Sequence, residues 1–241
     1  MKESIAQYMS EQNPFILFGT DHILGFLIFA ILWVIIPFGA KKYLNKNTQK
    51  QVGLALSLIV MSNYIIWVVL EILAGTFDFK LHLPFHLCRF ANLAIPFIFI
   101  RRNETLFQIL YYWGMSGMVQ GAITPDVTHG FPHFHYFRFF FGHNGMVLVL
   151  IYAIVINGYR PTLRGLYQSF LGINAFLALA AIVNISIGSN YFWICGKPPT
   201  ASLLDYLGPW PVYILAAEFV ALIHFIIAYI PFHYLNRKLQ S

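Results

Sequence analysis

One short segment of the chain carries side chains suited to acyl transfer or proton transfer. Residues 83–92, with the sequence LPFHLCRFAN, include His86, Cys88, Arg89 and Asn92. A cysteine acts as a nucleophile when a base or a cationic neighbour promotes its thiolate form. A helix turns by about 100° per residue, so His86 and Cys88 would point to nearly opposite faces of one helix. We therefore predict Cys88 as a nucleophile whose base comes from another helix, with His143 at matching depth.

Cys88 has two other interpretations. A lone cysteine in a membrane helix is more often an inert buried thiol than a reactive one. The other cysteine of the chain, Cys195, lies in a predicted loop on the same side, so a Cys88–Cys195 disulfide would pin that loop to the segment. A bridged pair could not also serve in catalysis, and the sequence leaves these roles open.

Other polar side chains gather at the same end of the predicted helices and are candidates for substrate binding. His86, Arg89 and Asn92 are suited to assist an oxyanion or a headgroup. The wider set of predicted binding residues adds Asp126, His133, Arg138, Asn190, Lys197 and Asp205. Ionisable groups inside a bilayer are costly and often functional. The alternative is a hydrogen-bonded plug, or side chains that lie in the wet interface.

Seven of the nine histidines lie near this end, namely His22, His82, His86, His129, His133, His135 and His143. The spacing H-x₃-H-x-H of His129, His133 and His135 could hold a metal if the segment were helical. Gly130 and Pro132 disfavour a regular helix there. The chain has no H-E-x-x-H motif and no cysteine-rich ligand set. We predict no metal site and no other cofactor.

Two further patterns have structural interpretations. The segment 189–211 is rich in proline, glycine and tryptophan, which predicts a folded lid over the polar end or an interfacial anchor. Gly117 and Gly121 form a G-x-x-x-G spacing, which is typical of close contact between membrane helices.

Seven apolar runs must position these residues. Hydrophobic residues make up 59% of the chain and charged residues only 10%, whereas soluble domains are about 25% charged. Each run approaches the roughly 20 residues that cross a bilayer as a helix. The sequence thus predicts one all-α integral membrane domain, residues 1–241, with spans at 22–40, 52–73, 84–100, 105–124, 138–157, 165–187 and 211–234.

The basic residues predict the orientation of this domain. Ten lysines and arginines fall in the connections and tail on one side of the predicted membrane, and four fall on the other. Positive charge favours the cytoplasmic side, so we expect the N-terminus outside and the C-terminus in the cytoplasm of a multi-pass cell-membrane protein. The net charge of +6 is then a topology signal that needs no nucleic-acid partner.

Three segments together resemble the YwaF-type family of bacterial seven-span membrane proteins. They are PFHLCRFA at 84–91, TPDVTHGFPHFHYFRFFFGH at 124–143 and NYFWICGKPPTASLLDYLGPWPVYIL at 190–215. That family is distantly similar to an animal seven-span acyltransferase that modifies ether phospholipids through an acyl-cysteine. The resemblance implies matching histidines at His86 and His143. The animal cysteine directly precedes the first of these, where this chain has Phe85, and Cys88 lies three residues further on.

Three functions are compatible with these patterns. The leading prediction is a phospholipid acyltransferase or transacylase acting at the outer leaflet through an acyl-cysteine. A transporter or ligand-binding protein with an outward-facing polar cup is the first alternative, although no inverted repeat or pair of broken helices is evident. The second alternative is a structural or sensory protein that binds a partner or lipid without turnover. The sequence does not indicate an oligomeric state.

Overall fold

The computed structural model describes residues 2–11, 13–199 and 202–238. The regular secondary structure of this part of the chain is helical, apart from one isolated bridge between Pro14 and His129. The longer helices are α2 (Thr20–Tyr43), α3 (Lys46–Ala74), α8 (Phe134–Tyr152), α9 (Leu163–Ile187) and α10 (Val212–Lys238). The shorter ones are α1 (Lys2–Met9), α4 (Leu87–Ala94), α5 (Phe97–Ile100), α6 (Glu104–Trp113) and α7 (Val119–Ile123). Gly114–Met118 (η1) and Ala153–Asn157 (η2) are π-helical, and Tyr191–Trp193 (η3) and Leu203–Tyr206 (η4) are 3₁₀ turns.

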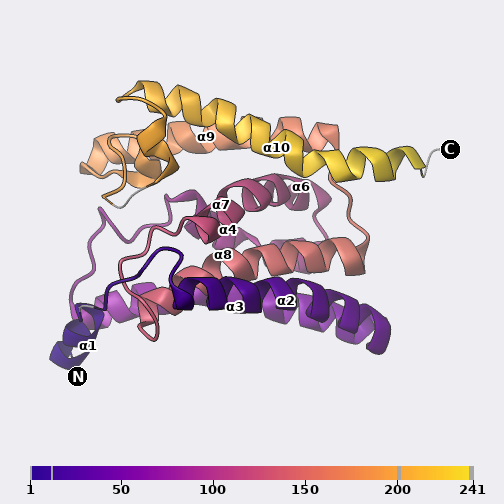
Figure 1. The fold of residues 1–241 in the computed structure, drawn as a ribbon, viewed down its shortest axis with the longest axis horizontal. Helices are drawn as coiled ribbons and strands as arrows, with labels where there is room; N and C mark the ends of the chain where they lie inside the picture. The colour runs from indigo at the N-terminus through magenta and orange to yellow at the C-terminus, as the bar shows by residue number, and fades with distance from the viewer. Residues whose placement is uncertain (1, 12, 200–201, 239–241) are drawn as a thin grey trace.

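The helices lie roughly along one long axis in three groups (Figure 1). Helices α9 and α10 form one outer group, and α2 and α3 form the other with α8 packed against them. The short helices α4, α6 and α7 lie between these groups. Helix α1 and the segment before α10 lie at one end of the molecule, and the C-terminal end of α10 lies at the other. The apolar pattern of the sequence does not predict α1.

Five helices are long and apolar enough to cross a membrane: Thr20–Tyr43, Lys46–Ala74, Phe134–Asn157, Leu163–Ile187 and Val212–Leu235. The predicted span 84–100 is not a single long helix, because Pro96, which has no N–H to donate, separates α4 from α5. The predicted span 105–124 corresponds to a helical run over residues 104–123, in which α6, the π-helical turns of η1 and α7 follow one another without a break. This run is not among the five helices above. By length and composition, five helices are thus candidates to cross a membrane. The seven spans and their orientation remain predictions from the sequence.

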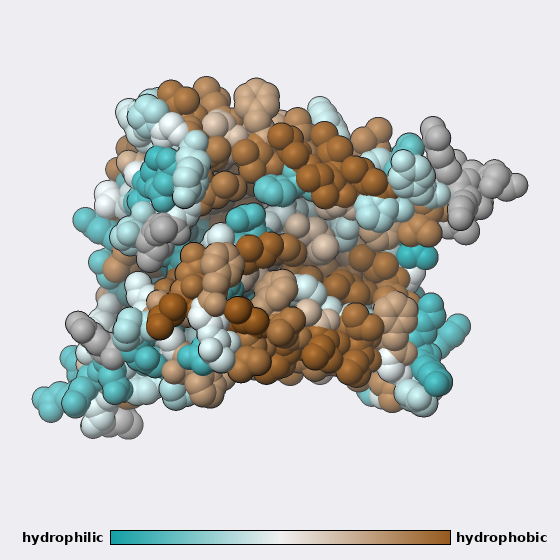
Figure 2. Space-filling view, in the orientation of Figure 1, coloured by the Kyte–Doolittle hydropathy of each residue, from teal (hydrophilic) through white to brown (hydrophobic). Residues whose placement is uncertain are grey.

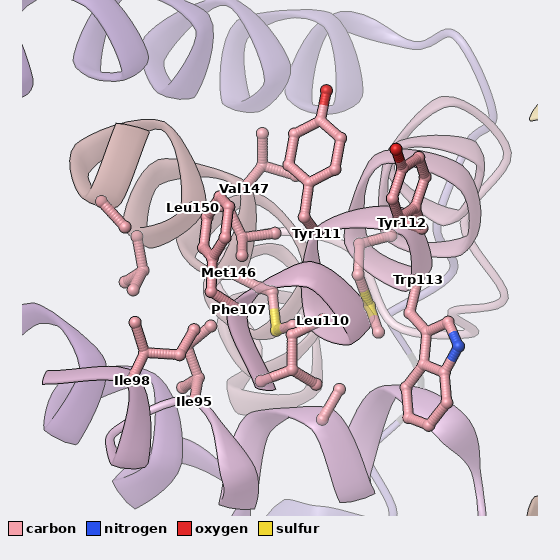
Figure 3. Close-up of a cluster of buried hydrophobic side chains, with 14 of the residues drawn as sticks. Ile95, Ile98, Phe107, Leu110, Tyr111, Tyr112, Trp113, Met146, Val147 and Leu150 are labelled. Carbon is pink, nitrogen blue, oxygen red and sulfur yellow. The ribbon is translucent and has the colours of Figure 1, made fainter. Parts of the chain in front are cut away.

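The central helices carry the buried core, which Figure 3 shows. Phe107, Leu110 and Tyr112 of α6 and Met146 and Leu150 of α8 are fully buried. The outer helices instead expose large apolar side chains, including Val34, Ile182 and Phe219, and brown hydrophobic residues dominate the middle of the face in Figure 2. An apolar outer surface around a packed interior fits a bilayer as the surrounding medium.

Candidate functional site

A cavity of about 460 Å³ collects most of the predicted chemistry of the chain. Its walls come from α3, from α4 and the loop before it, from the segment 121–126, from α8 and from Trp193. Among the predicted site residues, the lining includes His86, Cys88, Arg89, Asn92, Asp126, Arg138 and His143. His82 and His135 also line it, so four of the seven clustered histidines meet there. The structure thus brings these residues to one cavity, and their roles in catalysis and binding stay predictions.

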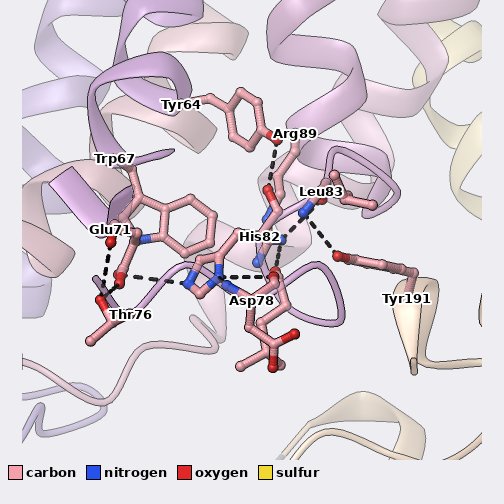
Figure 4. Close-up of polar contacts among 10 residues, drawn as sticks. Tyr64, Trp67, Glu71, Thr76, Asp78, His82, Leu83, Arg89 and Tyr191 are labelled. Carbon is pink, nitrogen blue, oxygen red and sulfur yellow. Dashed lines mark hydrogen bonds and ion pairs between the residues drawn. The ribbon is translucent and has the colours of Figure 1, made fainter. Parts of the chain in front are cut away.

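The indole of Trp67 is the platform for two cations in this cavity. The guanidinium carbon of Arg138 lies 4.0 Å from the centroid of the Trp67 ring, and that of Arg89 lies 4.5 Å from it. Arg89 also donates to the carbonyls of Leu81 and Leu83 (Figure 4). Two guanidiniums held on one aromatic ring give this part of the cavity a chemistry that suits an anion.

A carboxylate and a histidine border the platform (Figure 4). Trp67 Nε1 donates to Glu71 Oε1 at 2.8 Å, and His82 Nε2 lies 3.7 Å from the same oxygen. His82 Nδ1 lies 2.8 Å from the backbone N–H of Asp78 and 3.0 Å from the Asp78 carbonyl, so both backbone groups of Asp78 fix the ring with Nε2 toward Glu71. Burial lowers the pKa of His82 from its ordinary value, and the nearby Glu71 opposes this effect only in part. His82 is therefore a neutral hydrogen-bonding group at neutral pH.

Cys88 lies in the first turn of α4, and His86 is the residue that precedes this helix. The expectation that His86 and Cys88 point to opposite faces of one helix is wrong, because the helix begins only at Leu87. Both side chains line the same cavity. The His86 ring packs against Tyr191 at 5.3 Å and Trp193 at 5.1 Å, measured between ring centroids.

His143 is fixed in an orientation that suits a base. Its Nδ1 lies 3.0 Å from the Phe139 carbonyl, which can only accept, so the ring proton is on Nδ1 and the lone pair is on Nε2. The ring stacks on Phe139 with 4.0 Å between centroids. A Cβ on Gly121 would lie 2.8 Å from His143 Cδ2. The imidazole thus packs against Gly121, where any side chain would collide with it.

Several buried polar atoms of the cavity have no hydrogen-bond partner within the described residues. They are Asn92 Oδ1, His135 Nδ1 and Arg138 Nε. Burial of an unsatisfied polar atom costs about 1–3 kcal/mol. Three such atoms in residues that line one cavity indicate a place where a polar ligand or water completes the hydrogen bonds.

Both cysteines are free, so the disulfide alternative is wrong for this structure. Cys88 is half-buried at the cavity, whereas Cys195 is exposed in the segment after η3. Two free thiols in different environments leave Cys88 available for chemistry and make Cys195 its natural control.

The segment between α9 and α10 is described over residues 188–199 and 202–211 and is called the lid segment below, and three predicted binding residues make contacts within it. Asn190 donates to the Gly196 carbonyl and accepts from the backbone of Cys195, both at 2.9 Å. Asp205 forms a capping box with Ser202, and Lys197 Nζ lies 3.4 Å from the Asp205 carbonyl. None of Asn190, Lys197 and Asp205 lines the cavity. Their contacts in the structure are those of the lid, and their binding role stays a prediction.

His129, His133 and His135 form a cluster near α1, and of the three only His135 lines the cavity. Their potential ligand atoms lie within 4.8 Å of one another. The rings of His129 and His133 stack with 4.2 Å between centroids and 19° between planes. His133 also uses both nitrogens, one on the Tyr8 carbonyl at 2.9 Å and one on the backbone N–H of His135 at 3.2 Å. The contacts of His133 are those of a residue that joins α8 to α1.

Sequence reasoning missed the face of α3 that lines the cavity. Asn63, Trp67 and Glu71 recur every four residues, so they share one face of the helix. A polar or amphipathic residue at each of these positions within an apolar span was the signal that could have revealed them. Trp193, in the segment that the sequence predicts as a lid or an interfacial anchor, lines the cavity as well.

These features define the class of protein: a multi-pass helical membrane protein with a polar, cationic cavity between its central and outer helices. The model of the TMEM164 family matches residues 17–229, and the chain belongs to that family. An uncharacterised protein of Treponema pallidum (strain Nichols) is 24% identical over 227 residues, covering 93% of this chain and 92% of its own. No solved structure matches. The finer resemblance to the YwaF-type family stays a prediction.

Proposed function

We propose that this protein is a membrane-embedded acyltransferase that moves a fatty-acyl chain between phospholipids through a thioester on Cys88. The observation that carries the proposal is the presence of Cys88, His143 and two guanidiniums in the lining of one cavity. The distant resemblance to the animal acyltransferase adds support. The proposal includes seven spans, with the cavity opening toward the outer leaflet of the cell membrane.

The first half-reaction forms the acyl-enzyme. His143 Nε2 takes the proton of the Cys88 thiol while Sγ attacks the ester carbonyl of the donor lipid. The carbon–oxygen ester bond breaks, the lysolipid oxygen leaves, and it receives the proton from His143. In the second half-reaction His143 takes the proton of an acceptor hydroxyl, whose oxygen attacks the thioester, and the proton returns to Sγ. The exchange is balanced and needs no other reactant.

The two guanidiniums on the Trp67 ring support a phospholipid as the substrate. Arg89 and Arg138 over Trp67 suit a phosphate monoanion, which accepts from guanidiniums through more than one oxygen. Cys88, one residue before Arg89, lies in the first turn of α4, where the helix dipole favours negative charge. A lipid held by its phosphate at Arg89 would thus bring its ester region near Sγ.

An exchange assay tests the proposal. Purified protein in liposomes receives a phospholipid with deuterated acyl chains and an unlabelled lysophospholipid, and mass spectrometry follows the label into the lysophospholipid. We expect transfer by the wild-type protein and by Cys195→Ala, and none by Cys88→Ala. Equal rates for Cys88→Ala and the wild-type protein, or no transfer by a folded wild-type protein with a range of headgroups, would reject the proposal.

A further inference from the structure

A second space in the molecule is lined mostly by apolar side chains. It is a groove of about 240 Å³ between η1, α9, α10 and the lid segment. Figure 2 shows a hollow on this face between the upper and middle groups of helices. Its walls include Leu87, Ile173, Leu177, Phe192, Ile214 and Val220. Hydrocarbon is the natural filling of an apolar groove between helices that expose apolar side chains.

The polar side chains in the groove largely have partners of their own. Ser116 donates to the Tyr112 carbonyl at 2.7 Å, and Gln120 donates to Thr124 Oγ1 at 3.1 Å. Glu218 accepts from Asn174 at 3.0 Å. His224 of α10 also lines the groove, and the other lining residues are mostly apolar, so the groove is largely an apolar slot.

The groove and the polar cavity are neighbours, because residues adjacent in the sequence line the two spaces. Leu87 lines the groove and Cys88 lines the cavity, and Gln120 and Gly121 are divided in the same way. Trp193 lines both spaces. The boundary between the apolar slot and the cationic cavity therefore runs beside the predicted nucleophile.

The backbone at this boundary is strained. Phe192 and Trp193 have φ of 59° and 54°, in a region that bulky residues rarely adopt. Two side chains hold them there: Tyr213 of α10 donates to the Trp193 carbonyl at 2.6 Å, and Trp210, which precedes α10, donates to the Ile194 carbonyl at 2.9 Å. Such strain persists where the surrounding structure fixes it and clusters at functional sites.

We propose that the groove binds one acyl chain of the same phospholipid whose phosphate lies on Arg89 and Arg138, with Trp193 at the boundary between chain and headgroup. This inference rests on the proposed function and adds the site of the chain. An amphiphile with an anionic head and an apolar tail matches the two adjoining spaces in charge and polarity. Neither a soluble anion nor a membrane helix would fill both.

Gly117 gives a way to fill the groove without disturbing the fold. It lines the groove, and a Cβ at this position would meet no atom within 4 Å. Gly39 in α2 is equally open but lies in a different helix, away from the groove. Gly117→Leu and Gly39→Leu therefore form a matched pair. Ala221→Phe, on the opposite wall formed by α10, is a second variant that blocks the groove.

Native mass spectrometry of delipidated protein titrated with palmitoyl-oleoyl phosphatidylglycerol tests the proposal. We expect one tightly bound lipid on the wild-type protein and on Gly39→Leu. Gly117→Leu and Ala221→Phe should each weaken its binding at least tenfold while their thermal unfolding stays close to that of Gly39→Leu. Equal binding by all four proteins would overturn the proposal, as would equal weakening by Gly39→Leu. A dimer in place of a lipid adduct, lost in Gly117→Leu, would assign the groove to a second copy.

Two further variants separate this inference from the proposed function. Cys88→Ala should retain the bound lipid, because the thiol is not needed to hold it, and Arg138→Gln should weaken it. If the variants bind lipid as predicted but no protein exchanges acyl chains, the acyltransferase proposal is rejected and the acyl-chain site in the groove is retained. If Gly117→Leu changes neither acyl exchange nor lipid binding, the acyltransferase proposal is retained and the acyl-chain site in the groove is rejected.

Discussion

The guanidinium carbon of Arg138 lies 4.0 Å from the centroid of the Trp67 ring, which joins α8 to α3 at the floor of the cavity. Arg89 of α4 lies over the same ring at 4.5 Å. One indole thus sets the position of two cations that come from different helices. The electron-rich face of the indole attracts both guanidiniums and so offsets part of the repulsion between the two like charges.

Replacing Trp67 should weaken headgroup binding more than chemistry. A cation–π contact contributes about 0.5–2 kcal/mol, so we expect Trp67→Ala to raise KM of acyl exchange roughly 5- to 30-fold, with a smaller change in kcat. Trp67→Phe keeps a ring under both guanidiniums and loses only the hydrogen bond to Glu71. It should therefore recover most of the affinity. Equal KM values for Trp67→Ala and the wild-type protein would contradict the role of the platform.

His143→Gln should abolish turnover and leave lipid binding intact. General-base catalysis contributes about 10²–10⁴-fold, and glutamine fills a similar space without accepting a proton. The control is His233→Gln, since His233 packs against Tyr229 and Tyr234 and does not line the cavity. Steady-state exchange rates and native mass spectrometry measure the two properties. Turnover within threefold of wild type in His143→Gln would remove this residue from the mechanism.

Gly121→Ala should displace the base without removing it. The added Cβ would lie 2.8 Å from His143 Cδ2 and 3.1 Å from Nε2, so the imidazole must move. We expect a loss of acyl exchange of at least tenfold, because small displacements of a reacting group are costly. Gly39→Ala meets no neighbour within 4 Å and should have no effect. A fully active, stable Gly121→Ala protein would show that the His143 orientation is not needed.

The stability of the fold should fall as pH drops below neutrality, in part because of His82. Burial lowers its pKa in the folded protein below the ordinary value near 6.5. The neutral ring therefore contributes its full stability above about pH 6.5, and this contribution is lost as pH falls toward the folded pKa. We expect the Tm in detergent to decrease from pH 7 to pH 5 in the wild-type protein. His82→Gln should show a shallower decrease, and an equally steep one would contradict the assignment.

Part of this site could be predicted from the sequence. Cys88, Arg89, Arg138 and His143 stand out because ionisable or nucleophilic groups are rare in apolar runs of a membrane protein. A hydropathy pattern gives the position of each residue along its membrane span. These positions place the four residues near the same end of the predicted helices. The cavity that they share follows from that common depth.

The remaining errors come from contacts that a one-dimensional pattern cannot supply. The segment before α4 is held by hydrogen bonds from Tyr191 to the Phe79 carbonyl and from Leu83 to Tyr191, so α4 begins later than its apolar run. Asn190 is polar and near the site, yet it binds lid backbone. Gly117 and Gly121 belong to one motif, but only Gly121 contacts another helix closely.

The thiol of Cys88 offers the most direct test of the central claim. Purified protein incubated with donor phospholipid is acid-quenched, and intact mass with peptide mapping is measured before and after hydroxylamine. The account predicts a fatty-acyl mass on Cys88, absent from Cys195, that hydroxylamine removes and that accumulates when no acceptor is present. An unmodified Cys88 in protein that still exchanges acyl chains would contradict the account, because transfer would then proceed without the thioester.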